Sequence, residues 1–156
     1  MMSEILEQSK IFFRKRKTVT TNPNSCSGCQ ICQMICSLKH DDFIELERSR
    51  IRVISDSFKG TSKIIVCAQC HDAPCYYACS ESAIEFNQSN GSVLINKERC
   101  NGCRSCEKAC PYNAILFSFN DNKAYKCQLC GGEPECVKWC PMNSLGISIF
   151  GGELTQ

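Results

Sequence analysis

The 156-residue sequence has no long apolar run and no excess of charge of one sign. Its longest apolar stretches, such as residues 64–66 and 114–117, are far shorter than the roughly 20 residues that cross a bilayer. Eighteen basic and 16 acidic residues give a formal net charge of +2, which favours neither a nucleic-acid binder nor an acidic solvating chain. We therefore expect no membrane span and no nucleic-acid partner.

A secretion signal is also missing, because the apolar residues 11–13 precede the basic run 14–17 instead of following it. This order predicts a cytoplasmic protein. Thiols stay reduced in the cytosol, so cysteines there serve more often as metal ligands than as disulfides.

Motifs for bond-making chemistry are absent. The sequence contains no Walker loop, no G-x-G-x-x-G fingerprint and no Ser-His-Asp set. The acidic residues at 41, 42, 45 and 47 lie beside arginines at 48, 50 and 52, which is typical of a solvated charged surface. The sequence therefore predicts a protein that is not itself an enzyme.

Cysteine is the residue that the sequence has in abundance, with 16 among 156 residues. This level marks a domain that an aliphatic core alone does not stabilise. The cysteines form four groups of four, and each group opens with C-x2-C and closes with C-x3-C. The groups are Cys26, Cys29, Cys32 and Cys36; Cys67, Cys70, Cys75 and Cys79; Cys100, Cys103, Cys106 and Cys110; and Cys127, Cys130, Cys136 and Cys140.

The third group, with Pro111 after its last cysteine, matches the bacterial ferredoxin pattern C-x2-C-x2-C-x3-C-P. Two-residue spacers let a loop curl around one [4Fe–4S] cube, so three cysteines reach three irons. The fourth cysteine faces away and binds a neighbouring cluster. Sixteen thiolates at four per cube predict four [4Fe–4S] clusters. Gly28 and Gly102, which precede the second cysteines, fit either a close approach to a cluster or a tight turn.

Other uses of the cysteines remain open. Zinc ribbons also use C-x2-C pairs, although usually as two pairs separated by a longer spacer. A disulfide framework would require export. His71, which follows Cys70, and His40 are the only histidines, and ligation by either is the minor alternative because the thiolates already number sixteen.

Short strand-like runs lie between the cysteine groups. We expect strands at residues 51–54, 63–66 and 147–150 and hairpins that join 83–86 to 92–95 and 114–119 to 123–126. The expected helices are short turns that lead to the fourth cysteine of each group, stopped by Pro111 and Pro141 in two cases. Residues 1–23 hold no cysteine and are read as an N-terminal arm or edge strand, or as a docking segment. Its apolar contacts would be Ile5, Leu6, Ile11, Phe12 and Phe13.

A family resemblance follows from these motifs. Residues 67–75 read C-x-x-C-x-x-x-P-C, and residues 126–141 repeat the pattern with a proline before Cys136 and another after Cys140. Across residues 24–150 the chain resembles the four-cluster, ferredoxin-like electron-transfer subunits that accompany molybdenum and tungsten enzymes, some hydrogenases and carbon monoxide dehydrogenases. Residues 36–40 and 49–53 are most similar to the small iron–sulfur partners of tungsten aldehyde oxidoreductases.

The resemblance implies an α+β fold of two nested two-cluster ferredoxin-like units within residues 24–156. The outer unit would comprise residues 24–60 with 120–150, and the inner unit 61–119. In order along a wire, the implied ligand sets are Cys26, Cys29, Cys32 and Cys140; Cys127, Cys130, Cys136 and Cys36; Cys67, Cys70, Cys75 and Cys110; and Cys100, Cys103, Cys106 and Cys79. Two residues depart from the family pattern. Ser80 stands where proline usually follows Cys79, and Ser37 stands where proline sometimes follows Cys36.

The implied function is single-electron transfer, at low potential and in anaerobic metabolism, between a catalytic molybdenum or tungsten subunit and a second redox partner. The first ligand set would face the catalytic subunit, and a flavin-containing protein or a ferredoxin would serve as the second partner. Two alternatives remain: self-association into an iron–sulfur wire or bridge between complexes, and a zinc-binding interaction module.

Overall fold

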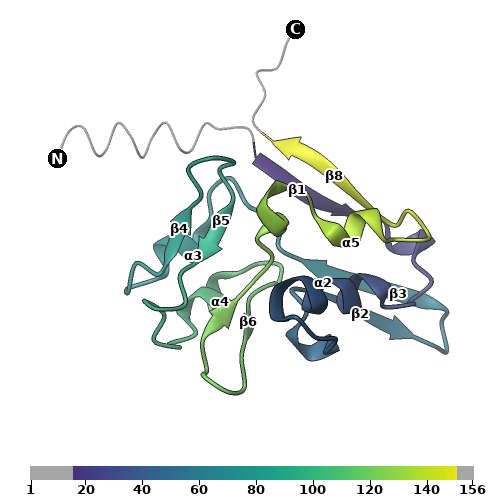
Figure 1. Cartoon of the computed structure of the whole chain (residues 1–156), viewed down its shortest axis with the longest axis horizontal. Coiled ribbons are helices and arrows are strands. Elements are labelled where there is room, and N and C mark those ends of the chain that lie inside the picture. Colours follow the sequence, from purple (N-terminus) through teal and green to yellow (C-terminus); the bar gives the residue numbers. More distant parts are fainter. Residues whose placement is uncertain (1–15, 151–156) are drawn as a thin grey trace, which may run out of the picture.

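The computed structural model describes residues 16–150 as short helices and two-stranded sheets (Figure 1). The strands are β1 Arg16–Thr21, β2 Ile51–Asp56, β3 Thr61–Val66, β4 Ile84–Phe86, β5 Val93–Ile95, β6 Leu116–Phe117, β7 Ala124–Tyr125 and β8 Leu145–Phe150. The α-helices are α2 Ile31–Asp41, α3 Pro74–Tyr77, α4 Ser105–Ala109 and α5 Glu135–Lys138, and the 3-10 helices are η1 Pro23–Ser25, η2 Leu46–Arg48 and η3 Leu129–Gly132. Within residues 16–150, no helix has both the length and the apolarity needed to cross a membrane.

All four sheets are antiparallel pairs. Three are local hairpins, β2–β3, β4–β5 and β6–β7, and each connects two successive cysteine groups. The two hairpins expected at residues 83–95 and 114–126 are therefore confirmed. The fourth pair, β1–β8, joins the two ends of the described chain, with Val19 opposite Ile147 (Figure 1).

The predicted N-terminal arm falls only partly within the described residues. Residues 16–21 form β1, which agrees with the edge-strand reading, and Val19 is buried at 5% exposure. The five apolar residues proposed as docking contacts, Ile5, Leu6, Ile11, Phe12 and Phe13, lie outside the part of the chain that the structure describes.

Three α-helices are single turns, as expected, but α2 has 11 residues and continues five residues beyond Cys36. Its buried residues Cys32, Gln33, Cys36 and Ser37 form one face at helical spacing. No glycine or proline interrupts the segment, and the left-handed residue Asp42 ends it. The expectation of a short turn up to Cys36 was therefore wrong, because Ser37 supports a helix where proline would have stopped it.

Buried side chains form two cores, and cysteines contribute to both. The first core gathers residues of β1, β2, β3 and β8 together with Cys32, Cys36, Cys127 and Cys136. The second gathers residues of β4, β5 and β7 around Cys106. Aliphatic contacts between such short elements are few, so the cysteine loops stand where a larger domain would have continuous apolar packing.

Hairpin residues pack against the first and third cysteine loops at equivalent glycines. Gly28 and Gly102 have φ values of +72° and +79°, and a Cβ atom at either position would overlap Ser55 or Asn122. In both loops the residue two positions after the glycine is also left-handed: Gln30 has φ +60° and Arg104 has φ +62°. Both glycines therefore serve a tight turn and a close contact with a hairpin.

We predict that Gly102→Ala lowers the free energy of unfolding more than Gly131→Ala does. Both glycines have φ +79°, but a Cβ at Gly131 meets no atom within 4 Å, whereas one at Gly102 would overlap the backbone of Asn122. The left-handed backbone alone should cost about 1–2 kcal/mol in both variants, and overpacking should add about 1–3 kcal/mol at Gly102. Chemical denaturation under anaerobic conditions measures the difference, and equal losses would contradict the packing argument.

Candidate metal centres

Three hollows in the structure are each surrounded by four cysteines. They enclose about 320, 310 and 290 Å³, counting the part that is open to solvent. In each hollow three cysteines come from one sequence group and the fourth comes from another. In the same order, the quartets are Cys26, Cys29, Cys32 and Cys140; Cys79, Cys100, Cys103 and Cys106; and Cys67, Cys70, Cys75 and Cys110. The structure thus brings together the members of three of the ligand sets that the resemblance implies.

The remaining four cysteines also lie near one another. Burial raises the pKa of the Cys136 thiol, and the charges of Cys127, Cys36 and Cys130 raise it further. Cys36, Cys127 and Cys136 are buried, and Cys130 is half-buried. This fourth quartet draws Cys36 from the first group and the other three cysteines from the fourth group, which is again the implied set.

Thiolates are costly in every quartet. Burial raises the pKa of Cys32, Cys75 and Cys106 to about 11 and that of Cys127 to about 12, and the other cysteines of the same quartet add to the shift for Cys32, Cys75 and Cys106. Four thiolates can be held this close together only around a cationic centre, since metal binding drives their deprotonation. The chemistry of the donor set therefore fits a metal group.

The arrangement fits a wide group better than a single ion. Among residues 16–150, no three His, Cys, Asp or Glu side chains converge closely enough to hold one metal ion. The cysteines of a quartet instead surround a hollow, as four ligands to the separate irons of a cube must do. All sixteen cysteines lie in the described residues, and each is a free thiol.

We call the fourth cysteine of each group its closing cysteine. Three of the four closing cysteines each begin a turn of the same kind. The sulfur of Cys79, Cys110 or Cys140 accepts a hydrogen bond from the backbone N–H four residues later, at 3.3, 3.5 and 3.3 Å respectively. The residues just before these donors, Ser82, Asn113 and Asn143, have φ values of +50°, +52° and +48°. Each turn therefore aims one backbone donor at the sulfur of its closing cysteine.

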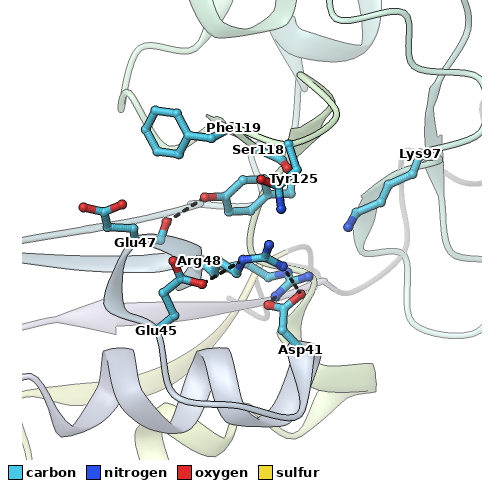
Figure 2. A pocket seen from close by; sticks show the side chains of 10 residues that line it. Asp41, Glu45, Glu47, Arg48, Lys97, Ser118, Phe119 and Tyr125 are labelled. Atoms are coloured by element: carbon cyan, nitrogen blue, oxygen red, sulfur yellow. Dashed lines mark hydrogen bonds and ion pairs between the residues drawn. The ribbon is translucent and has the colours of Figure 1, made fainter.

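Part of the charged surface expected from the sequence lines a hollow between α2, η2 and the β6–β7 hairpin, of about 480 Å³ counting the part that is open to solvent (Figure 2). Asp42, Glu45 and Glu47 are exposed, as expected. Arg48 pairs with Glu45 at 2.9 Å, and Arg50, which is only 8% exposed, pairs with Asp41 at 3.3 Å. Tyr125 Oη donates to the carbonyl oxygen of Glu47 at 2.8 Å. These contacts hold residues 45–50 against β7.

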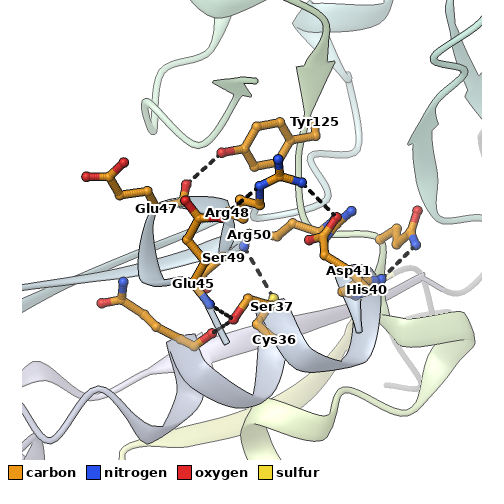
Figure 3. A network of polar contacts seen from close by, with 12 residues as sticks. Cys36, Ser37, His40, Asp41, Glu45, Glu47, Arg48, Ser49, Arg50 and Tyr125 are labelled. Atoms are coloured by element: carbon orange, nitrogen blue, oxygen red, sulfur yellow. Dashed lines mark hydrogen bonds and ion pairs between the residues drawn. The ribbon is translucent and has the colours of Figure 1, made fainter. Parts of the chain in front are cut away.

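Residues 45–50 place a backbone hydrogen-bond donor beside Cys36, the remaining closing cysteine (Figure 3). Cys36 lies inside α2, so the four-residue turn of the other groups cannot form. The backbone N–H of Arg50 donates to Cys36 Sγ at 3.3 Å instead. Ser37 fixes the same segment, because its fully buried Oγ accepts the N–H of Glu45 at 3.1 Å. A remote residue thus replaces the local donor.

His40, on the last turn of α2, contacts the same quartet. Its Nε2 lies 3.5 Å from Cys130 Sγ, and its Nδ1 lies 3.2 Å from the side-chain amide of Gln128. Burial, followed by the charge of Arg50, lowers the pKa of His40 to about 4, so the ring is neutral at pH 7. The imidazole therefore serves as a hydrogen-bonding neighbour of a thiolate. His71 is exposed.

Three further residues beside the quartets were not singled out from the sequence. Arg50 was read as surface charge, and Lys126 and Gln69 were passed over. Lys126 Nζ donates to Cys67 Sγ at 3.4 Å, and Gln69 Nε2 donates to the carbonyl oxygen of Cys127 at 2.9 Å. For Lys126 and Gln69, adjacency to a cysteine in the sequence was the only available signal. Adjacency does not distinguish a buried side chain from an exposed one.

The chain matches a known family and several known proteins. Residues 62–149 match the family described as the 4Fe-4S dicluster domain. The polyferredoxin-like subunit of the aliphatic sulfonate oxidoreductase of Pyrococcus furiosus is 38% identical over 121 residues, which cover 78% of this chain and 69% of that one. The putative electron transport protein YsaA of Escherichia coli is 35% identical over 125 residues, covering 72% and 74% of the two chains.

A solved structure shares the fold. One chain of the active-site complex BamBC of benzoyl coenzyme A reductase, with benzoyl-CoA bound, superimposes with a TM-score of 0.52 over 87% of this chain and 81% of that one. The two sequences are 24% identical, so the likeness is one of fold alone.

We predict opposite effects for proline at the two serines that follow closing cysteines. Ser80 is exposed in a turn closed by Ser82 N–H and the Cys79 carbonyl oxygen, at the place of Pro111 and Pro141. Ser80→Pro should therefore raise the free energy of unfolding by about 0.4–1 kcal/mol. Ser37→Pro should lower it by about 3 kcal/mol or more, because this residue lies inside α2. Chemical denaturation measures both, and destabilisation by Ser80→Pro would show that the turns are not equivalent.

Proposed function

Because the chain belongs to the 4Fe-4S dicluster domain family, we propose that it is an iron–sulfur electron-transfer subunit of an oxidoreductase complex whose sixteen cysteines hold four [4Fe–4S] clusters. The observation that carries the proposal is the exchange of closing cysteines: each hollow takes three thiols from one group and a fourth from another. A [4Fe–4S] cluster, when bound, exchanges single electrons. The chain's own residues supply the thiolates, the N–H donors that stabilise them and the exclusion of water.

The order of the quartets follows from exposure and proximity. Cys29 and Cys103 are exposed and belong to different quartets, which would therefore be the two ends of the path. Cys67 and Cys127 belong to the other two quartets, and the charge of Cys67 raises the pKa of Cys127 beyond the effect of burial. These two quartets are therefore central. The charge of Cys32 also raises the pKa of Cys136, which supports placing the quartet of Cys136 next to the quartet of Cys29, in the order of the implied wire. The inner unit, residues 61–119, would then be nested against the outer unit.

The two ends differ in the chemistry of their surroundings. The hollow of Cys29 is lined by uncharged residues, including Pro141 and Met142, whereas Glu81 and Arg104 line the hollow of Cys103. Stable subunit interfaces are depleted of charge at their centres, and charge steers transient encounters. We therefore assign the Cys29 end to a catalytic subunit of the molybdenum or tungsten class, with a tungsten aldehyde oxidoreductase as one candidate. The Cys103 end would meet a soluble flavin-containing protein or ferredoxin.

The proposal predicts the metal content of the protein. Anaerobically purified full-length chain should contain about one iron and one acid-labile sulfide per cysteine, because four cubes use one cysteine for each iron. It should become paramagnetic on reduction with dithionite. Metal analysis, sulfide determination and electron paramagnetic resonance (EPR) measure these properties. A colourless protein that contains zinc and no sulfide would contradict the proposal and favour a zinc-binding module.

The ligand sets can be tested by comparing iron loss in single and double variants. Cys79→Ala and Cys103→Ala should affect the same site, so the double variant should lose no more iron than either single variant. Cys79→Ala combined with Cys70→Ala should damage two sites, so the two losses should add. Additive loss in the first pair together with shared loss in the second would assign Cys79 to the quartet of its own group and refute the exchange.

A further inference from the structure

Lys126 is a buried cation between the two central quartets. Its side chain is only 3% exposed, it immediately precedes Cys127, and it lines the hollow of Cys67, Cys70, Cys75 and Cys110. Nζ donates to Cys67 Sγ at 3.4 Å, to the carbonyl oxygen of Cys127 at 3.3 Å and to the carbonyl oxygen of Val93. The side chain thus contacts one residue from each of the two quartets.

The charged form of the amine matches the three acceptors. An ammonium group has three N–H donors and no acceptor, whereas a neutral amine has only two donors and would turn a lone pair towards the third oxygen or sulfur. Cys67 Sγ and the two carbonyl oxygens together use all three donors. Lys126 is therefore held as a cation in a site with almost no access to water.

This cation has no carboxylate partner among the residues that the structure describes. The ion pairs formed within residues 16–150 join other basic residues to Asp or Glu, and Lys126 contacts only carbonyl oxygens and sulfur. Burial of an unpaired ion is costly. The thiolates of the two central quartets could offset this cost, since Nζ contacts Cys67 Sγ at 3.4 Å and Lys126 lines the hollow of that quartet.

Gln69 fixes the surroundings of the cation. Its side chain is 1% exposed, its Nε2 donates to the Cys127 carbonyl oxygen at 2.9 Å, and its Oε1 accepts the N–H of Val93 at 2.7 Å. Gln69 therefore ties together the two residues whose carbonyl oxygens Lys126 contacts. These contacts hold the acceptors of Lys126 in place, so its charge acts on both quartets from a constant position.

We propose that Lys126 is the shared counter-cation of the two central quartets and raises the reduction potentials of the clusters held there. The inference rests on the proposed function, because it assumes that the central quartets hold clusters. A fixed positive charge favours the reduced form, which carries one more negative charge, and burial leaves this attraction little screened by salt. Lys126 would thereby keep the middle of the electron path from becoming a barrier to reduction.

The test is a redox titration of the full-length, cluster-loaded protein, followed by EPR. In Lys126→Met, which keeps the length of the side chain and removes its charge, two of the four reduction steps should move to lower potential. At a fixed potential the ratio of reduced to oxidised cluster should fall about tenfold in those steps, which corresponds to about 59 mV for one electron. Lys126→Arg, which retains a positive charge, should keep the original potentials.

Lys138→Met is the matched control. Lys138 lies between Cys136 and Cys140 in the sequence, but its side chain is 51% exposed and pairs with Glu133 and Glu135 at 3.3 Å. Water and these carboxylates screen its charge, so all four potentials should stay unchanged. A shift in this control as large as that in Lys126→Met would show that general surface charge is responsible, and would overturn the proposal.

The potentials and the iron content of the Lys126 variants also decide whether the proposal holds. Unchanged potentials in Lys126→Met would overturn the proposal, as would a measurable loss of iron that is the same in Lys126→Met and Lys126→Arg. Iron loss from Lys126→Met alone would support it, because assembly of the central sites would then depend on the charge. Iron and sulfide in the unaltered protein are measured first, and their absence would refute the proposed function, whereas full occupancy with unshifted potentials would refute only the role of Lys126.

Discussion

The structure depends on thiols from distant parts of the chain meeting around shared hollows. Cys140 lies with Cys26, Cys29 and Cys32, so the last cysteine group is tied to the first. The same is true of Cys110 and Cys67, which are 43 positions apart in the sequence. Strands of two to six residues and helices of which all but α2 are single turns bury too little apolar surface to hold such segments together. Coordination is therefore the interaction that would stabilise the tertiary structure, and folding would be coupled to metal binding.

The second requirement is to make a concentration of negative charge tolerable inside a small protein. Burial and mutual repulsion raise the pKa of Cys32 and Cys136, and the chain places two kinds of donor beside its cysteines. Backbone N–H groups are aimed at Cys36, Cys79, Cys110 and Cys140. Lys126 brings a full positive charge to the place where two quartets approach each other. Repetition of the turn therefore serves electrostatics as well as geometry.

Local features of the fold were predictable from the sequence, whereas contacts between distant segments were not. The hairpins at residues 83–95 and 114–126 were marked by alternating apolar residues around polar turns, and both formed. The extension of α2 depends on Ser37, whose buried hydroxyl meets the N–H of Glu45 eight residues later. Arg50 was misread as surface charge for the same reason, since its burial depends on Asp41 and on the neighbouring Tyr125.

The candidate site divides in the same way. The cysteines and their spacing are visible in the sequence, but their pairing between groups came from the resemblance, because spacing alone cannot say which distant group supplies a closing ligand. Lys126 illustrates what spacing leaves out. A lysine before a C-x2-C pair reads as an ordinary solvated residue, and only the approach of Val93 and Cys67 from other segments makes it an internal cation.

Departures from the repeat give the four quartets different environments, although their cysteine patterns are similar. Cys29 and Cys103 are exposed, whereas every cysteine of the other two quartets is buried or half-buried. Cys36 receives its donor from Arg50 and not from its own turn, and Cys130 has His40 beside it. Solvent exposure and hydrogen bonds to sulfur are the means by which proteins set the potentials of otherwise identical clusters. A strict repeat would make all four sites alike, so the irregular residues are those that can give an electron path its direction.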